Sequence, residues 1–419
     1  MRQSIFRVLA TLITLSLAFG VAQADRRTSL RGNMLIADRD DTFIYPQLAV
    51  KSQYNRSLSI DFGANQDAGN ALFIAGPDKK SAIAIALHRG DAVAFTGNSY
   101  DGSFEPGMIS NSNGVLSYPM SAAMAGSAQP PIIADLMYAM KQGKNKLGFR
   151  LGFVGVGQSQ DNDGDHVGTD SSFGLRLGAG YSMGQKTDLA FNIAWGSGKI
   201  TTGKDEDEVA EAGAIAVGFN GRHFLTNGKK FKLGLLFDLS YLGESNKDYT
   251  ANNDPEMSRN TINAMVGFGP VYRKKNSYTV AFHGHFGVRM ISEDPNSEAD
   301  DDEISNMNVM FPGFNVAMEY RVLDWLDFRS GASYSYLIAG SESVGDVTTT
   351  TNGQNGAFGW NAGFGILMED LQINGTLSHG FVTGGPQFIG GYSGGLFSMV
   401  SVVGNFGGGK KKGPKPAAE

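Results

Sequence analysis

Strict alternation between apolar and polar residues is the feature that most constrains how this chain can fold. In the segment FKLGLLFDLSYL, residues 231–242, every second side chain from Phe231 to Tyr241 is Phe, Leu or Tyr. In an extended strand these side chains share one face, while Lys232 and Asp238 lie on the other. Such a strand fits a soluble sandwich, whose polar face meets water, or a membrane barrel, whose apolar face meets lipid.

The alternation recurs along the chain, which predicts one sheet of many similar strands. It runs through residues 146–155, 173–182, 189–196, 279–290, 326–338, 356–368 and 371–378, each about as long as a tilted membrane strand. About 13 strands are expected from residue 132 onward, and up to three more in LSIDFG, NALFIA and SAIAIALHR. Single-chain bacterial barrels have an even strand number. We therefore predict an all-β fold, a single transmembrane antiparallel β-barrel of about 14–16 strands.

Two kinds of connection separate the expected strands, and their sorting favours a barrel over a sandwich. Short polar turns are expected near residues 142–146, 183–187, 273–277, 322–325 and 368–370. Longer loops are expected at residues 157–171, 197–208, 243–258, 292–303, 339–355 and 380–394. Transmembrane barrels have short turns on the periplasmic side and long loops on the outer side, whereas a sandwich has no reason to sort its loops.

The start of the chain predicts secretion. Arg2 and Arg7 precede a short apolar run, and Ala22-Gln23-Ala24 fits a cleavage site, so residues 1–24 read as a signal peptide. No later apolar run reaches the roughly 18 residues of a membrane-spanning helix, which leaves a closed barrel as the way through a bilayer. We expect the outer membrane of a Gram-negative bacterium, with both termini in the periplasm.

Within the mature chain we expect a plug at residues 25–57, the barrel at 58–406 and a flexible basic tail at 407–419. Residues 90–131 do not alternate, and they form either a long outer loop or something folded into the lumen. The chain has 57 glycines, about twice the usual share, which fits inward faces where the backbone and the lumen contents approach closely. The absence of cysteine excludes disulfides and Cys-ligated metals, and the net charge of −6 argues against nucleic acid as a partner.

A loose motif precedes the first expected strand. The segment GNMLIADRDDTFIYPQLA, residues 32–49, resembles the hatch of the FadL-like outer-membrane transporters and the related PorV-like proteins. The residues that fit are Ala37, Asp38, Asp40, Asp41, Tyr45, Pro46, Leu48 and Ala49. The chain departs from the family on both sides of the proline: the family has Asn before it and Ala-Gly after it, whereas this chain has Tyr45 before Pro46 and Gln47-Leu48 after it. The resemblance implies a 14-strand barrel plugged by its own N-terminus, with passive uptake of hydrophobic compounds when the plug shifts. The candidate plug residues are Asp38, Arg39, Asp40, Asp41, Phe43, Tyr45 and Pro46.

Charges of both signs fall on the expected inward faces. The candidate lumen residues are Arg150, Arg176, Asp238, His283, His285, Arg289, Glu319, Arg321, Asp327 and Arg329. Paired across the lumen they would rigidify a plugged barrel, and in a water-filled pore they would set ion selectivity. Lipid contact is expected for Phe173, Leu175, Leu177, Phe237, Leu239, Phe328 and Phe364.

No metal or cofactor site is predicted. His283 and His285 share one face, but metal binding would need a third ligand from a neighbouring strand. Asp161, Asp163 and Asp165 resemble the start of a calcium loop, yet the Gly and Glu of the EF-hand pattern are absent from it. We interpret these three aspartates as part of an ordinary acidic outer loop. An alternative is that they bind divalent cations weakly and bridge to lipopolysaccharide.

The sequence leaves several functions open. No nucleophile with a Ser/His/Asp arrangement stands out, so we do not expect an enzyme. The leading hypothesis is passive transport of a hydrophobic or amphipathic small molecule past the plug. The alternatives are a structural or partner-binding barrel, such as a PorV-like component with a periplasmic or secretion partner, and a general porin. Outer-membrane lipid and lipopolysaccharide are the expected surroundings.

Overall fold

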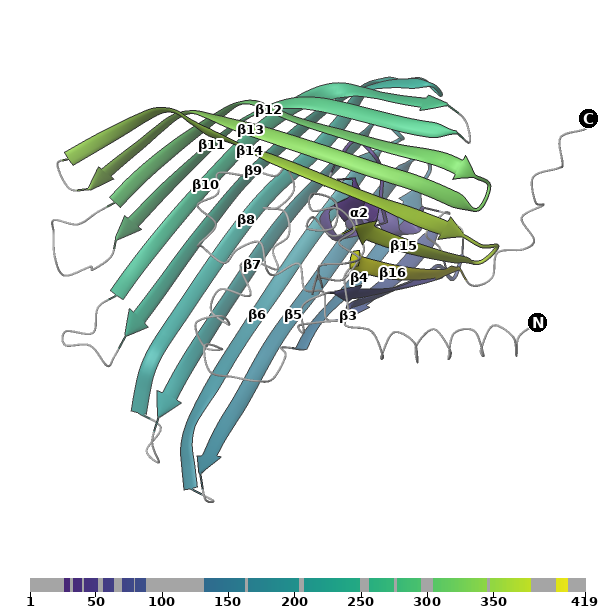
Figure 1. Ribbon diagram of the computed structural model, residues 1–419. Coiled ribbons are helices and arrows are strands. Elements are labelled where there is room, and N and C mark those ends of the chain that lie inside the picture. The colour runs from purple at the N-terminus through teal and green to yellow at the C-terminus, as the bar shows by residue number, and fades with distance from the viewer. Residues whose placement is uncertain are drawn as a thin grey trace, which may run out of the picture.

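The computed structural model is a closed antiparallel barrel of 16 strands (Figure 1). It describes residues 26–30, 33–39, 41–51, 56–63, 70–78, 80–87, 132–162, 165–202, 207–248, 256–274, 277–294, 304–344, 347–377 and 397–405. Each strand pairs with its neighbours in sequence, and β1 pairs with β16 to close the ring. The predicted signal peptide, residues 90–131 and the basic tail lie outside the described residues.

The strands are β1 Ser57–Gly63, β2 Asn70–Ala75, β3 Ser81–Leu87, β4 Ile132–Gln142, β5 Asn145–Asn162, β6 Asp165–Met183, β7 Thr187–Thr202, β8 Asp207–Asn227, β9 Phe231–Asp248, β10 Glu256–Lys274, β11 Tyr278–Asp294, β12 Ile304–Leu323, β13 Leu326–Val344, β14 Val347–Leu367, β15 Leu371–Leu377 and β16 Phe397–Asn405. The predicted all-β barrel is confirmed, with 13 strands after residue 132 and three before it. The count of 14 implied by the hatch resemblance is wrong.

Most strands are longer than the sequence pattern predicted. Strands β5 to β14 have 16 to 21 residues, and β5 and β6 between them take up most of the expected loop at residues 157–171. Backbone pairing continues there, for example between Ser341 and Thr350. Beyond the apolar belt both faces of a hairpin are polar, so the alternation ends before the strand does. This is why the periodicity underestimated strand length.

The outer surface of the barrel is an apolar belt. Leu177 and Leu239 are exposed by 54% and 51%, and Phe173 and Leu175 are also exposed. Phe237, Phe328 and Phe364 are half-buried. Phe237 lies over Gly221 of the neighbouring strand, which has no side chain to fill that outer position, and this accounts for its partial burial. The residues between these positions, such as Arg176 and Asp238, are buried on the inner face.

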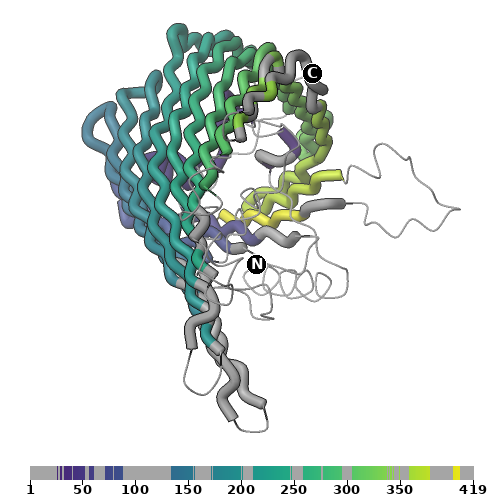
Figure 2. Tube along the Cα trace, turned by 90° about the vertical axis from the view of Figure 1, so that its left-hand side faces the viewer, coloured from purple at the N-terminus to yellow at the C-terminus, as the bar shows by residue number. Residues whose placement is uncertain are grey.

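In the described part of the chain, three short helical elements lie inside the ring of strands, where Figure 2 shows the purple start of the chain. They are α2 (Arg26–Ser29), α3 (Asp41–Ile44) and the 3₁₀ helix η1 (Pro46–Val50), and we call the described residues from 26 to 51 the plug. Helix α2 packs against β13, β14 and β15, and η1 packs against β3, β4, β5 and β6. In the part of the chain that is described, no helix is long and apolar enough to cross a membrane.

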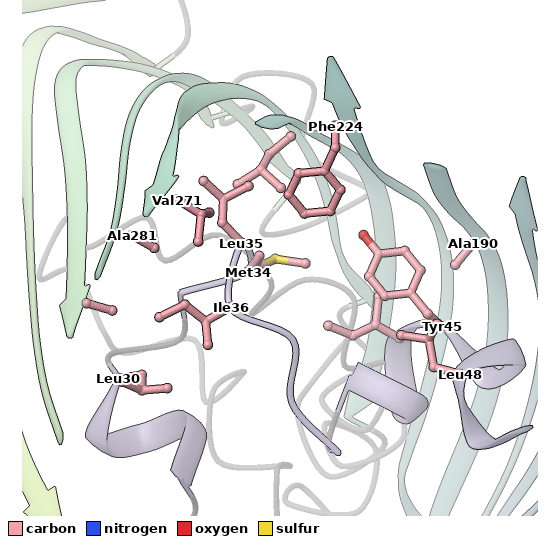
Figure 3. Close-up of a cluster of buried hydrophobic side chains, with 13 residues drawn as sticks. Leu30, Met34, Leu35, Ile36, Tyr45, Leu48, Ala190, Phe224, Val271 and Ala281 are labelled. Atoms are coloured by element: carbon pink, nitrogen blue, oxygen red, sulfur yellow. The ribbon is translucent and has the colours of Figure 1, made fainter. Parts of the chain in front are cut away.

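The plug has its own apolar contacts with the wall. Figure 3 shows side chains of the plug and of the strands meeting in one buried cluster. Its plug members are Leu30, Met34, Leu35, Ile36, Ile44, Tyr45 and Leu48, and its wall members include Ala190, Phe224, Leu236, Val271 and Ala281. A second cluster joins Phe43, Ala49 and Val50 to small and apolar residues of β2, β3 and β4. The plug is therefore packed as a folded element, since a free tail would not bury these side chains.

Glycines of the wall allow the plug backbone to approach closely. A Cβ atom on Gly148 would collide with the backbone of Pro46 and Gln47, and one on Gly180 would collide with the Gln47 side chain. This close approach gives a structural use to part of the high glycine content.

Replacing Gly148 by Ala is expected to push η1 off the wall and to lower the free energy of unfolding by about 1 to 3 kcal/mol, the usual cost of overpacking. Thermal unfolding in detergent measures the loss, and proteolysis of the plug reports its release. Gly218→Ala is the control, because the nearest atom to its added Cβ would be 4.0 Å away. Equal losses in the two variants would contradict the assigned contact.

Candidate functional site: the interface between plug and lumen

The first charge cluster ties α3 to β4, β5 and β6. Arg150 donates to both carboxylate oxygens of Asp135 at 2.9 Å, and its Nη1 donates to the carbonyl oxygen of Phe43 at 2.6 Å. Its guanidinium lies 5.1 Å from the centre of the Phe43 ring. Arg176 adds a contact to Asp135 at 3.3 Å. Because all three charged side chains are almost fully buried, this bidentate pair fixes the geometry of the wall around the plug.

The second cluster is centred on Arg222 of β8. Its Nε donates to Asp188 at 2.7 Å, and its Nη1 donates to the plug carboxylate of Asp41, also at 2.7 Å. The same Nη1 donates to the carbonyl oxygen of Met34 at 3.0 Å, and the guanidinium lies 5.0 Å from the centre of the Tyr45 ring. Arg222 is 2% exposed. One wall cation thus contacts three residues of the plug: Met34, Asp41 and Tyr45.

The third cluster holds the beginning of the plug. Arg26 of α2 contacts Glu319 of β12 and Asp38 of the plug, each at 2.6 Å. Arg329 of β13 shares the Glu319 carboxylate at 2.9 Å and donates to Asn374 at 2.7 Å. Glu319 is therefore bound by one cation of the plug and one of the wall, and it joins the two.

Neutral hydrogen bonds supplement these clusters. Asn33 donates to Asn315 of β12 at 2.7 Å, and Ser29 Oγ lies 2.6 Å from Thr376 Oγ1 of β15. Gln47 donates to the carbonyl oxygen of Leu189 at 3.2 Å. The plug is bonded around much of the ring, from β5 to β15, so no single strand holds it.

Several of the candidate residues meet in these clusters. They are Asp38, Asp41, Phe43 and Tyr45 of the plug and Arg150, Arg176, Glu319 and Arg329 of the wall. Pro46 is buried at the start of η1, and Arg39 is half-buried. Asp40 lies outside the described residues.

The other candidates for the lumen do not contact the plug, although Asp327 lies 3.8 Å from Arg329 of the third cluster. Arg321 contacts Asp327 at 2.9 Å near the short turns, where the Arg321 side chain is 38% exposed. Arg289 donates to Asn263 at 2.8 Å. Asp238, His283 and His285 are buried on the inner face, farther along their strands than the residues that contact the plug.

Among the described residues no group of three His, Cys, Asp or Glu side chains could hold a metal ion. The backbones of Asp161 and Asp165 belong to β5 and β6, but Asp163 and the side chains of the other two lie outside what the structure describes.

Sequence reasoning missed four charged residues of the clusters: Arg26, Asp135, Asp188 and Arg222. The alternation could have found two of them. Asp188 lies an even number of positions from Asn192, and Arg222 an even number from Asn220, so each points to the inner face with that asparagine. Both lie near a strand end, where too few alternating residues remain to show which face points inward. Arg26 precedes the strands altogether, and no periodicity applies to it.

Lys51, which follows η1, adds a pH dependence to this site. Burial and the nearby positive charges of Arg222 and Lys146 lower the pKa of Lys51 to about 8, against the opposing attraction of Asp41 and Asp188. The docked plug thus disfavours the charged amine, and an undocked or unfolded chain binds the proton more tightly. Stability therefore rises with pH between about 8 and the ordinary pKa of 10.5.

Replacing Lys51 by Met is expected to remove this penalty. Below pH 8 the variant gains up to roughly 3.5 kcal/mol of stability over the wild type, because the pKa falls from 10.5 to about 8 and one pKa unit corresponds to about 1.4 kcal/mol. The gain shrinks as pH rises toward 10. Thermal unfolding of both proteins across this range measures the difference, and a gain that does not change with pH would contradict the assignment.

Comparison with known proteins finds similar solved structures but no family. No protein-family model matches it, and no curated protein sequence matches it. Similar solved structures include the toluene transporter TodX of Pseudomonas putida, with 11% identity over 93% of this chain and 99% of TodX and a TM-score of 0.35. The translocator domain of the autotransporter NalP from Neisseria meningitidis has 12% identity over 64% of this chain and 90% of its own, with a TM-score of 0.32. The iron transporter FrpB of the same organism has 8% identity over 77% and 61%, with a TM-score of 0.39.

Proposed function

We propose that this protein is an outer-membrane barrel that passes hydrophobic or amphipathic small molecules when its plug moves. The observation that carries the proposal is the three-cluster attachment of the plug. The plug fills part of the lumen, and its described residues are attached to the wall through side chains and belong to no strand. A segment held in this way can shift as a unit while the wall, closed by backbone hydrogen bonds, stays intact.

The outer surface supports a membrane location. The strands close into a ring, and the exposed side chains form the apolar belt described above. Tyr181, Tyr272, Tyr320 and Trp325 are exposed near the short turns, as in the aromatic girdle of barrels at the membrane interface. By the usual orientation the short turns face the periplasm, and the start of β1 and the end of β16 lie on that side. Lipid and lipopolysaccharide would then surround the wall.

The pairing of the inner charges favours gated passage over a general porin. A wide water-filled pore would leave charged rings free to select ions, whereas Arg150, Arg222 and Arg329 are buried in contact with carboxylates. The resemblance of residues 32–49 to a transporter hatch points the same way. We propose no enzymatic activity, because the buried charges of the clusters serve to hold the plug.

Conductance in planar bilayers tests the proposal. The wild type is expected to be nearly silent, and a variant without residues 26–51 is expected to conduct. A disulfide between Ser29→Cys and Thr376→Cys, whose oxygens lie 2.6 Å apart, should lock the plug in this cysteine-free chain. The locked form should block uptake of a hydrophobic probe until it is reduced. If the deletion variant assembles but stays silent, the structural or partner-binding function replaces this one, and if the wild type conducts freely, the porin does.

A further inference from the structure

Among the described residues, a group of neutral and acidic side chains on the inner wall of β7, β8, β9 and β11 carries buried atoms that have no hydrogen-bond partner. These side chains are Asn192, Asn220, Asp238, His283 and His285, which we call the polar strip, and each is between 1% and 4% exposed. The atoms without a partner are both amide atoms of Asn192, Oδ1 of Asn220, Oδ1 of Asp238 and all four imidazole nitrogens. A buried polar group left unbonded costs about 1 to 3 kcal/mol. Several such atoms side by side on strands β7, β8, β9 and β11 call for a functional reason.

The polar strip lies directly beyond the plug. On each strand a residue of the strip follows, two positions farther from the short turns, a residue that packs or bonds with the plug. The pairs are Ala190 and Asn192, Arg222 and Asn220, Leu236 and Asp238, and Ala281 and His283. His285 comes two positions after His283. A molecule that crosses the lumen from the outer side would therefore meet these groups immediately before the plug.

The free atoms of the polar strip favour a positively charged hydrogen-bond donor. Asp238 accepts a hydrogen bond from Asn220 Nδ2, and no cation among the described residues pairs with it. Acceptors outnumber donors, because three side-chain oxygens and one nitrogen of each neutral imidazole accept, while the Asn192 amide and the remaining imidazole nitrogens donate. A buried carboxylate is costly until a cation compensates it, so a bound cation would relieve the largest of these costs.

Apolar side chains border the polar strip. Met265 of β10 is the cross-strand partner of Asp238 and is 5% exposed, and Met310 of β12 lies one strand beyond β11 on the inner face and is 4% exposed. Methionine side chains are flexible and polarizable, and they adapt to apolar ligands of different shape. The wall thus offers an apolar surface next to an acceptor-rich one.

We propose that the polar strip binds the protonated amino group of an amphipathic amine, whose apolar part lies against Met265 and Met310. The inference rests on the proposed function in so far as the amine is the molecule that passes the plug. It narrows the substrate class to primary ammonium compounds with an apolar body, because an amphipathic carboxylate would be repelled by Asp238.

Calorimetric titration of the purified protein in detergent, with hexylammonium and hexanoate as matched probes, tests the inference. Hexylammonium is expected to bind at least tenfold more tightly than hexanoate, and Asp238→Asn is expected to abolish that preference. Glu244→Gln is the control, since Glu244 is a buried carboxylate on the same face of β9, six positions away, and it should leave the preference unchanged. Because binding is measured without transport, a barrel that fails the conductance test can still show it.

Three outcomes would overturn the inference: equal affinity for the two probes, no loss in Asp238→Asn, or an equal loss in Glu244→Gln. Binding of Zn²⁺ that is lost in the double variant His283→Ala/His285→Ala, with no binding of hexylammonium, would replace it by a metal site. If Asp238→Asn does not assemble, the comparison of the two probes on the wild type still decides between the outcomes.

Discussion

Replacing Arg222 by Ala is expected to lower the free energy of unfolding by about 3 to 5 kcal/mol, the usual cost of breaking a buried ion pair from one side. The variant leaves the carboxylates of Asp41 and Asp188 buried without their shared cation, and it removes the donor to the Met34 carbonyl. It also removes the cation above the Tyr45 ring. The plug should therefore loosen, and thermal unfolding together with proteolysis of the plug should report both changes.

The matched control is Arg321→Ala. Arg321 also contacts a carboxylate, Asp327, but its side chain is 38% exposed near the short turns and does not contact the plug. Asp327 is 4% exposed, but it keeps Arg329 at 3.8 Å when Arg321 is removed, and the partly exposed Arg321 is screened by water. The variant should therefore lose only about 1 kcal/mol, with the plug still protected. A small loss in Arg222→Ala, comparable to the control, would mean that the plug is held by apolar packing alone.

An arginine on the outer surface should have an effect that depends on depth in the membrane. Leu177 lies within the apolar belt on β6, where its cross-strand partners are Leu151 and Ile193. Leu177→Arg is expected to cost about 2 to 4 kcal/mol in a bilayer, because charge at the midplane of the lipid face is poorly solvated. Folding and unfolding in lipid vesicles measures the cost.

Met183→Arg provides the comparison on the same face of the same strand. Met183 is 48% exposed at the end of β6, next to the short turn, where a long cation reaches the interface at a cost of about 0 to 1 kcal/mol. If both variants lose the same stability, the belt does not face lipid, and the membrane placement fails with it.

The sequence by itself determined the faces of the strands and the class of fold. Alternation is a local property, since each side chain points opposite to its neighbour, so Leu177 and Arg176 are assigned to opposite faces without knowledge of any partner strand. The number of alternating segments then determined the strand count to within two, since it predicted 14–16 strands and the barrel has 16. The pattern fails where both faces are polar, so it predicts a loop where the structure has the outer halves of β5 and β6.

Only the tertiary structure decided which charges meet. Asp41 and Arg222 are 181 positions apart, and Arg26 and Glu319 are 293 apart. The alternation indicates that Arg222 points inward. Which carboxylate it meets depends on the register of every strand between β4 and β8 and on the path of the plug through the lumen. The plug has no period of its own, and its position follows from the space left by glycines such as Gly148 and from the cations that face it. The face on which a side chain lies depends only on its neighbours in the chain, because successive residues of a strand point to opposite sides. The residue that it meets across the lumen depends on how the whole barrel closes.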